Sequence, residues 1–236
     1  MLYLASQSPR RRALLRQLRR PFRTVRSSHR ETIRRGVPPS RNAIHNAAGK
    51  AIKARLPRNA KGIVIGADTF LYFHGRIIGK PRTMREAERM LQALSGTSHW
   101  VYTGVCLRDV ATGRMRTGAV RTRVTFKRLT RETIRRLLHR MAPLDKAGGY
   151  AIQEDRGQLI ARIDGSRSNV IGLPLELLRR ELRAFHAKVI GLRPPAPAFA
   201  RGGPGRRGTP HSLLRVAKQP EATRSMWGRR WEGRIP

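Results

Sequence analysis

The sequence predicts an α/β fold with a mixed, twisted sheet and flanking helices. Across residues 1–190, short apolar runs typical of strands alternate with longer segments in which apolar residues recur at helical spacing. Capping residues, prolines and glycines separate most of these segments. Strands and helices that alternate in this way pack as helices against a shared sheet.

In the first half of the chain the expected elements are a strand at 2–5, a helix at 9–19, a helix at 41–56, strands at 62–72 and 76–78, and a helix at 84–94. Ser40 is expected to cap the second helix and Pro57 to end it, because serine accepts a backbone N–H at helix starts and proline breaks a helix. Thr83 and Glu86 form a capping-box pattern for the third helix. The connection at 73–75 predicts a hairpin.

In the second half the expected elements are strands at 100–108 and 114–127, a helix at 130–140, a glycine-rich loop at 146–150, a strand at 158–163 and a helix at 175–190. After Gly191 the chain becomes rich in Pro, Gly and Arg and has no sustained period. We therefore expect a folded domain at 1–192 and a tail at 193–236 without stable structure of its own.

The chain carries 51 basic residues against 14 acidic ones, a formal net charge of +37. One interpretation is a polyanionic partner such as nucleic acid. The other is compositional drift towards arginine. We favour drift because 43 of the basic residues are Arg, only eight are Lys, and they are spread along the whole chain. Nucleic acid therefore stays an alternative partner and not the expected one.

The sequence indicates neither a membrane span nor a secretory leader. No apolar run approaches the length of a spanning helix, and the first residues lack the apolar segment of a signal peptide. The single cysteine, Cys106, lies in an apolar run that resembles a strand. We therefore expect a buried thiol in a reducing cytoplasm.

Asp68 is the only carboxylate between Glu31 and Glu86, and it follows the apolar run that begins at Ile63. A carboxylate at the end of a strand can hold a divalent cation or accept a proton from water. The alternative is an ordinary turn aspartate that caps its own loop. Taken alone, the residue leaves both interpretations open.

The segment that begins at Ser8 is a candidate phosphate site. Ser8 and Pro9 suit the start of a helix, yet its first turn holds three arginines, at 10–12, where acidic residues are normally preferred. A phosphate bound by backbone N–H groups and arginine side chains would explain this reversal. The alternative is that three more arginines in an arginine-rich chain carry no meaning.

Three further polar residues are candidates for the same ligand. Lys50 and Lys80 could each place a charge on a phosphate oxygen, or be ordinary solvated lysines. Gln153, after the glycine-rich loop, has the paired donor and acceptor that can read a base edge, or belongs to a structural turn. Walker-type loops, GxSxG and cysteine pairs for zinc are missing from the sequence, and residues 1–192 contain no GxGxxG.

Seven segments, in order and with preserved spacing over residues 2–190, resemble the Maf family of nucleotide pyrophosphatases. They are LYLASQSPRR (2–11), AAGKA (47–51), IGADT (65–69), GKP (79–81), YTGV (102–105), PLDKAG (143–148) and SNVIGLP (168–174). The resemblance implies a cytoplasmic enzyme with a mixed α/β fold, similar to inosine triphosphatases, and two lobes around a nucleotide cleft. It also implies that nucleoside triphosphates are cleaved between the α- and β-phosphates into monophosphate and pyrophosphate.

The resemblance also assigns roles to individual residues. Asp68 would be the proton acceptor. Ser8, Arg11, Lys50 and Lys80 would line the phosphate site, while Arg10, Thr69 and Gln153 stand at the positions that mark the branch acting on dTTP and UTP. The implied cofactor is a divalent cation, Mg²⁺ or Mn²⁺, with Glu31 as a further candidate ligand. A nucleoside triphosphate is the implied partner, and a homodimer stays open.

Two positions depart from the family pattern. Ala142 stands where a Glu usually precedes the PLDKAG segment, and Glu154 stands where a Gly usually follows Gln153. If the missing carboxylate helps to hold the metal, cation affinity or rate would be lower here. Two alternatives to the enzyme also stay open: a basic protein that binds nucleic acid, and a nucleotide-binding regulator of cell division that does not turn over its ligand.

Overall fold

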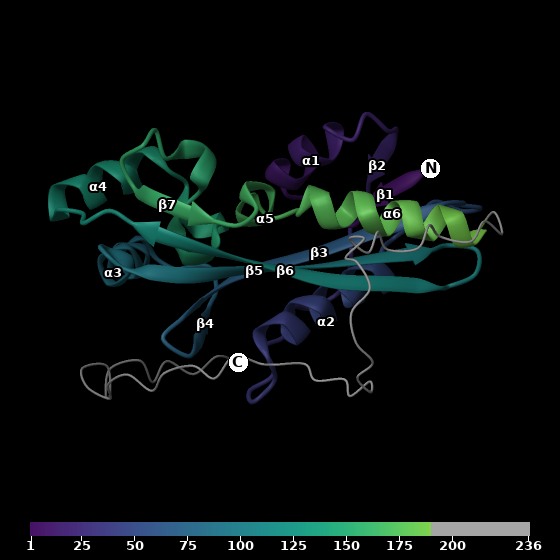
Figure 1. The fold of residues 1–236 in the computed structure, drawn as a ribbon, viewed down its shortest axis with the longest axis horizontal. Coiled ribbons are helices and arrows are strands. Elements are labelled where there is room, and N and C mark those ends of the chain that lie inside the picture. The colour runs from purple at the N-terminus through teal and green to yellow at the C-terminus, as the bar shows by residue number, and fades with distance from the viewer. Residues whose placement is uncertain (190–236) are drawn as a thin grey trace, which may run out of the picture. The chain divides into compact units, whose positions relative to one another are not determined.

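The structure, a computed structural model, describes residues 1–189. It contains a seven-stranded mixed sheet in the order β2-β1-β3-β5-β6-β7, with β4 paired to β3 (Figure 1). The strands are β1 (Leu2–Leu4), β2 (Phe22–Thr24), β3 (Ile63–Phe73), β4 (Arg76–Ile78), β5 (Ser98–Asp109), β6 (Met115–Phe126) and β7 (Ile160–Asp164). β1 runs parallel to β2 and β3, and the other pairs are antiparallel. The predicted α/β class with a mixed sheet is confirmed.

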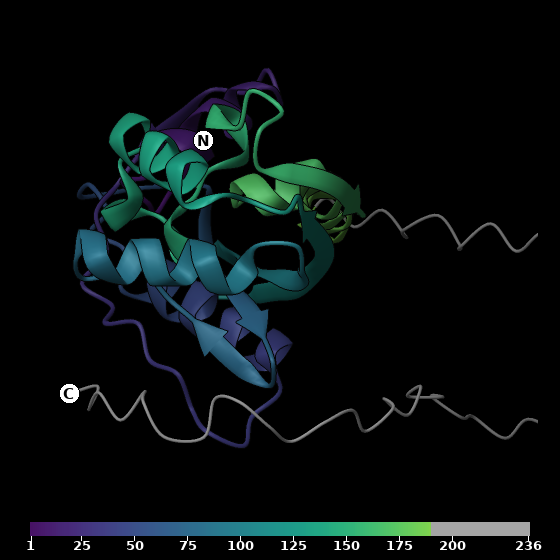
Figure 2. The ribbon, with the colours of Figure 1, turned by 90° about the vertical axis from the view of Figure 1, so that its left-hand side faces the viewer.

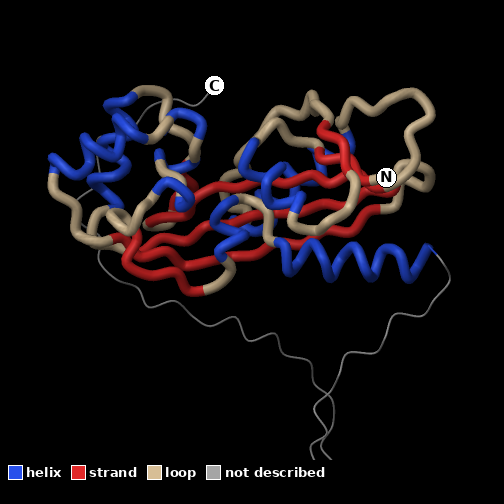
Figure 3. The backbone as a smooth tube through the Cα atoms, turned by 90° about the horizontal axis from the view of Figure 1, so that it is seen from above, coloured by secondary structure: helices blue, strands red, loops and turns tan. Residues whose placement is uncertain are grey.

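Helices cover both faces of this sheet. They are α1 (Pro9–Arg16), α2 (Pro39–Ile52), α3 (Met84–Leu94), α4 (Arg131–Arg140), α5 (Arg167–Ile171) and α6 (Leu175–Val189). α2 lies on one face, together with the hairpin of β3 and β4 (Figures 1 and 2). The other face carries α1, α5 and α6 at one end and α3 and α4 at the other, as the view from above shows (Figure 3).

Alternation along β3 explains why its apolar run is almost continuous. Ile63 and Ile65 pack in a core with α1 and α6. Val64, which points the opposite way, packs in a second core with Ala47 and Ala51 of α2. A strand covered on both faces needs apolar residues at every position, unlike a strand with one wet face. The apolar segment before Asp68 is therefore buried from both sides.

Two glycines let α2 lie directly on the sheet. A Cβ atom at Gly66 would lie 2.0 Å from the carbonyl oxygen of Ala47, and one at Gly104 would lie 2.2 Å from the carbonyl carbon of Ala43. Helix backbone cannot move aside as the end of a flexible side chain can. These two positions therefore set the distance between α2 and strands β3 and β5.

Replacing Gly104 by alanine is expected to push α2 off the sheet. We expect a loss of about 1–3 kcal/mol in the free energy of unfolding, the usual cost of overpacking a core. Urea denaturation would measure it. Gly79→Ala is the matched control, because a Cβ there meets nothing within 4 Å. Equal stabilities of the two variants would contradict the close approach.

The expectation for the start and end of α2 was wrong. The N-cap is Pro38 without a side-chain hydrogen bond, and Ser40 lies inside the first turn. A proline at the first helical position has a backbone dihedral already suited to a helix, so no serine cap is needed. The helix ends at Ile52, before Pro57, because Ala54 pairs with Ser27 in an isolated antiparallel bridge.

Other local expectations are confirmed, with small shifts at the ends of elements. Ser8 caps α1, Thr83 caps α3, and each hydroxyl accepts the backbone N–H three residues on. α1 ends at Arg16 and does not reach residue 19. In the hairpin, β3 runs to Phe73, which pairs with Arg76. The turn is therefore only two residues long.

Several short elements were not expected from the sequence. These are β2, α5 and three 3₁₀ turns at Pro143–Asp145, Ala147–Gly149 and Ile152–Glu154. β2 is a strand because it pairs with β1, and none of its three residues is fully buried. The end of the last helix at 190, the domain boundary at 192 and the tail at 193–236 lie outside the described residues.

Cys106 is fully buried, and burial raises the pKa of its thiol to about 11 despite the nearby charge of Arg108. Within residues 1–189, no helix combines the length and the apolar character needed to cross a membrane.

Candidate active site

A cavity of about 440 Å³ lies beside β3, next to the residues that follow β1. β1 ends at Leu4 and β2 at Thr24, whereas β3 continues to Phe73, so the parallel edge of the sheet opens there. Ligands commonly bind outside the carboxyl ends of parallel strands. The cavity is lined by all nine residues singled out from the sequence: Ser8, Arg10, Arg11, Glu31, Lys50, Asp68, Thr69, Lys80 and Gln153.

The walls of the cavity come from distant parts of the sequence. One wall is the turn and helix start at 5–11, and another is the segment at 145–153 that follows α4. These walls belong to the two ends of the sheet, which α1 with α6 and α3 with α4 cover separately. The cavity between these two groups of helices therefore corresponds to the cleft that was expected between two lobes.

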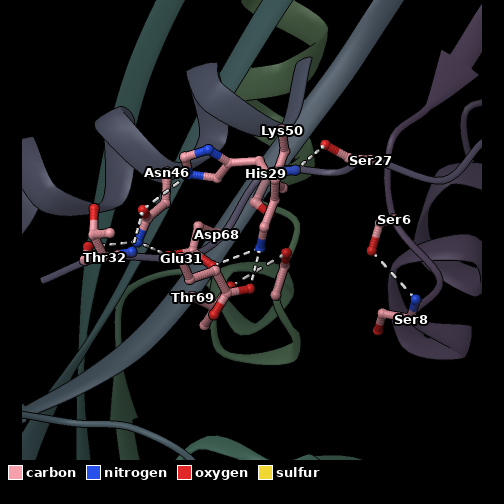
Figure 4. Close-up of polar contacts among 12 residues, drawn as sticks. Ser6, Ser8, Ser27, His29, Glu31, Thr32, Asn46, Lys50, Asp68 and Thr69 are labelled. Atoms are coloured by element: carbon pink, nitrogen blue, oxygen red, sulfur yellow. Dashed lines mark hydrogen bonds and ion pairs between the residues drawn. The ribbon is translucent and has the colours of Figure 1, made fainter. Parts of the chain in front are cut away.

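Asp68 is the buried carboxylate of this cavity. It lies in the middle of β3 and not at a strand end as expected, because the strand continues to Phe73 through its pairing with β5 and β4. Only 4% of its surface is exposed. Its Oδ1 accepts a hydrogen bond of 2.7 Å from Nζ of Lys50, and its Oδ2 accepts one of 2.8 Å from Nδ2 of Asn46 (Figure 4). Both oxygens are thus held, which fixes the plane of the carboxylate.

The surroundings of Asp68 keep it ionised. Burial alone would raise the pKa of Asp68, but the charge and hydrogen bond of Lys50 outweigh burial, and Arg11 and Asn46 add to the effect of Lys50. The pKa of Asp68 therefore lies below its ordinary value. At neutral pH the group is a carboxylate that can accept a proton.

Lys50 joins two carboxylates. Besides the bond to Asp68, its Nζ lies 2.6 Å from Oε1 of Glu31 and donates to the carbonyl oxygen of Ala67 at 3.2 Å. Lys50 is itself 9% exposed, whereas half of the Glu31 side chain is open to solvent. Glu31 therefore forms the solvent-facing side of this charged group.

Two buried asparagines of α2 hold the loop that carries Glu31. Asn46 exchanges hydrogen bonds with the backbone of Thr32, and Asn42 does the same with Arg34. His29 adds a contact of 3.3 Å between its Nε2 and Oδ1 of Asn46. Since Asn46 also binds Asp68, it ties the loop and the strand together.

Arg11 lies on the opposite side of β3 from Lys50. Its Nη2 donates to Oγ1 of Thr69 at 2.9 Å and its Nε to the carbonyl oxygen of Gly172 at 2.7 Å. Burial lowers the pKa of Arg11, although the charges of Asp68 and Glu31 oppose this. A guanidinium held in this way is already oriented before any ligand binds.

Arg10 is paired with the segment after α4. Its Nη1 and Nη2 donate to Oδ2 and to the carbonyl oxygen of Asp145, at 3.1 and 3.2 Å. Oδ1 of Asp145 also lies 3.2 Å from Nζ of the buried Lys146. Burial favours a higher pKa for Asp145, but Arg10 and Lys146 outweigh it and lower the pKa. Asp145 therefore links the two walls of the cavity.

The two departures from the family pattern meet at Lys146. Its Nζ donates to the carbonyl oxygen of Ala142 at 2.7 Å and lies 3.2 Å from Oε1 of Glu154. Glu154 therefore places a carboxylate beside Lys146, whereas position 142 contributes only its backbone carbonyl.

Buried aromatic residues support the segment that carries Gln153. The hydroxyl of Tyr150 lies 2.7 Å from Nε2 of His99, and Phe126 packs edge-on against both rings. Burial lowers the pKa of His99 to about 3 and raises that of Tyr150. Both groups are therefore neutral, and they fix this segment without adding charge.

Sequence reasoning missed Asn46, Asp145 and Lys146 as site residues. A signal for the first was available, because Asn42, Asn46 and Lys50 recur every four residues and so form one polar stripe along α2. No local pattern could have shown that Asp145 meets Arg10, since 135 residues separate them. Lys80 and the exposed Gln153 line the cavity as expected.

The site as a whole is a cationic cavity with one buried, ionised carboxylate. Arginine and lysine side chains of this kind bind phosphate, and a fixed carboxylate can accept a proton from water. The chain belongs to the Maf family, because the protein-family model described as Maf-like protein matches residues 1–185.

Curated relatives agree with this assignment. A protein from Pelotomaculum thermopropionicum named dTTP/UTP pyrophosphatase is 40% identical over 80% of this chain and 98% of its own length. Proteins of the same name from Desulfitobacterium hafniense and Bacillus cereus are each 43% identical, over 78% and 80% of this chain and 85% and 91% of their own lengths.

Proposed function

We propose that this chain is a nucleoside triphosphate pyrophosphatase that hydrolyses dTTP and UTP to the monophosphate and pyrophosphate. The observation that carries the proposal is the buried Asp68 carboxylate, held by Lys50 and Asn46 in a cationic cavity. The names and the extent of similarity of the curated relatives support the choice of substrate. The proposal assigns the activity to residues 1–192.

The proposed triphosphate site uses the start of α1 and the cations around it. Free backbone N–H groups and the partial positive charge of a helix start favour phosphate. Ser8, Arg10, Arg11, Lys50 and Lys80 would bind the phosphates, and Thr69 and Gln153 would help Arg10 select the base. Arg10 would exchange Asp145 for a phosphate oxygen when the nucleotide binds.

In the proposed reaction, water attacks the α-phosphorus, and pyrophosphate is the leaving group. The proton of this water passes to the carboxylate of Asp68, the bond from phosphorus to the bridging oxygen breaks, and pyrophosphate leaves. Phosphates that draw Lys50 and Arg11 towards them would weaken the hold of these cations on Asp68. Asp68 would thereby become a stronger base once the substrate is bound.

A divalent cation, Mg²⁺ or Mn²⁺, is part of the proposal. The carboxylates of Asp68 and Glu31 lie 2.7 and 2.6 Å from Nζ of Lys50, so two hard oxygen donors converge on an ammonium group that would have to turn towards the phosphates to admit an ion. Residues 1–189 contain no group of three or more His, Cys, Asp or Glu that could hold a metal. This donor set fits Mg²⁺ held partly by substrate phosphates, as is common. When bound, the ion would offset phosphate charge.

The proposal also includes a cytoplasmic location, where free nucleoside triphosphates are available, and leaves open whether the enzyme is a homodimer.

Pyrophosphate release from a panel of nucleotides tests the substrate assignment. We expect dTTP and UTP to be hydrolysed at least about tenfold faster than CTP or dATP, because a hydrogen-bonding site rejects bases that leave its polar groups unpaired. Gln153→Ala should lower this ratio of rates. Gln158→Ala, in the loop before β7, is the matched control and should leave the ratio unchanged. Binding of dTTP without turnover would instead favour the regulator.

A further inference from the structure

α2 covers only part of the sheet face on which it lies. Its backbone contacts the sheet at Gly66 and Gly104. From Gly104 towards the start of β5, the paired strands β3, β5 and β6 continue with no helix over this face among residues 1–189 (Figures 1 and 2). The opposite face of the same stretch is covered by α3 and α4.

The stretch between α2 and the hairpin of β3 and β4 carries aromatic and arginine side chains. Tyr72 stands opposite Trp100, Trp100 opposite Arg123, and Tyr102 opposite Arg121. Directly paired residues of a sheet share a face, so all five side chains project from the same side. We call these five residues the outer aromatic face. None of them lines the cavity described above.

The rings of this face are half-buried and in contact with one another. Tyr72 and Tyr102 pack edge to face with centroids 6.1 Å apart, and Phe70 stacks on Tyr102 from the neighbouring strand. The guanidinium carbon of Arg121 lies 4.8 Å from the centre of the Trp100 ring. These contacts hold the rings in fixed orientations while part of each stays open to solvent.

The face is also positively charged. Arg121 and Arg123 are exposed, and neither lies within ion-pair distance of a carboxylate of the described residues. The acid nearest in register is Asp164, opposite Arg123 on β7, and its carboxylate is paired with Arg162 at 2.5 Å. The face therefore has cations available for an anionic ligand.

Aromatic rings beside arginines that have no ion-pair partner in the described part of the chain indicate which kind of molecule would bind. A second copy of this chain is disfavoured, because it would bring its own Arg121 and Arg123 against the same positive surface. A single-stranded nucleic acid offers both complementary parts, since its bases can stack on rings and its phosphates can pair with guanidinium groups. Duplex DNA hides the faces of its bases and offers only phosphates.

We propose that the outer aromatic face binds single-stranded nucleic acid, with bases stacked on Trp100 and Tyr102. Arg121 would turn from the Trp100 ring to one phosphate, and Arg123 would pair with another. Residues two apart on a strand lie about 7 Å apart. The two rings can therefore take separate bases of an extended strand. This binding would be independent of hydrolysis in the cavity.

Tryptophan fluorescence gives a direct test in the full chain. The chain has three tryptophans, so Trp227→Phe with Trp231→Phe leaves Trp100 as the only one. We expect oligodeoxythymidylate to quench Trp100 at about 0.15 M salt. Replacing Arg121 and Arg123 by Gln should weaken binding about tenfold or more. The same change at Arg85 and Arg89, exposed on α3, removes equal charge and should weaken binding less than about twofold.

Three results would overturn the proposal: no quenching, equal weakening by the two pairs of substitutions, or equal competition by duplex DNA. Equal weakening would mean that the charge of the whole chain attracts nucleic acid without a defined site. Light scattering tests the other possible partner, a second copy of this chain. If the chain is a dimer and the Arg121 and Arg123 substitutions dissociate it, the face is a contact between copies and the proposal is wrong. Unchanged thermal unfolding of both double variants confirms that each is folded.

Discussion

Asp68→Asn is expected to reduce pyrophosphate release from dTTP by about a thousandfold or more. Asparagine has the same size and can still accept a hydrogen bond from Lys50, but it cannot accept a proton from water. General bases typically contribute factors of about 10²–10⁴, and this one would also lose its negative charge. Initial rates with saturating dTTP and Mg²⁺ would measure the effect.

The matched control for this substitution is Asp164→Asn. Asp164 lies on β7, is partly exposed and pairs with Arg162, so its loss removes an equal charge away from the cavity. We expect that variant to keep its activity. Full activity of Asp68→Asn would show that another group activates the water.

Lys50→Gln is expected to cost both stability and activity. Removing the lysine leaves the carboxylate of Asp68 buried without its main counter-charge, and breaking a buried ion pair typically costs about 3–5 kcal/mol. Asn46 and the solvent near Glu31 would offset part of this. Urea denaturation would measure the change, and Lys53→Gln, at an exposed position one turn on, should have little effect.

The same variant should change the pH dependence. In the wild type, the pKa of Asp68 lies below its ordinary value, with Lys50 outweighing burial. Its contribution to stability is therefore present above the ordinary pKa and is lost as pH falls through the lowered one. Without Lys50 the pKa should rise, so the acidic limb of the pH–rate profile should move to higher pH. If the acidic limb does not move, it does not reflect the ionisation of Asp68.

The long elements of the fold could be predicted from the sequence because their patterns are local. The apolar run of β3 and the capping threonine of α3 each determine structure from neighbouring residues. β2 could not be predicted, because it becomes a strand only by pairing with β1. The start of α2 was misplaced because Pro39 and Ser40 both suit a helix start, and the proline took the first position.

In the site, too, residues within short segments could be predicted from the sequence, whereas contacts between distant segments could not. Ser8 with Arg10 and Arg11, and Asp68 after its apolar run, stand out in short segments whose order matches a known family. The asparagines that hold the Glu31 loop act through contacts across 8 to 14 residues. The pairing of Asp145 with Arg10, and of Glu154 with Lys146, required the three-dimensional fold.

Two departures from the family pattern lie beside Lys146. Ala142 removes the carboxylate that the pattern places at that position, and Glu154 adds one 3.2 Å from the ammonium group of Lys146. If the missing carboxylate helps to hold the metal, the expected result is still a lower cation affinity or a lower rate.

The products formed from dTTP by the unmodified full chain with Mg²⁺ test the central claim most directly. Separation of nucleotides by ion exchange, with a parallel assay for pyrophosphate, should give dTMP and pyrophosphate in equal amounts. Formation of dTDP and inorganic phosphate would place the cleavage at a different bond. Unchanged dTTP, bound but not consumed, would contradict the assignment of this chain as a pyrophosphatase.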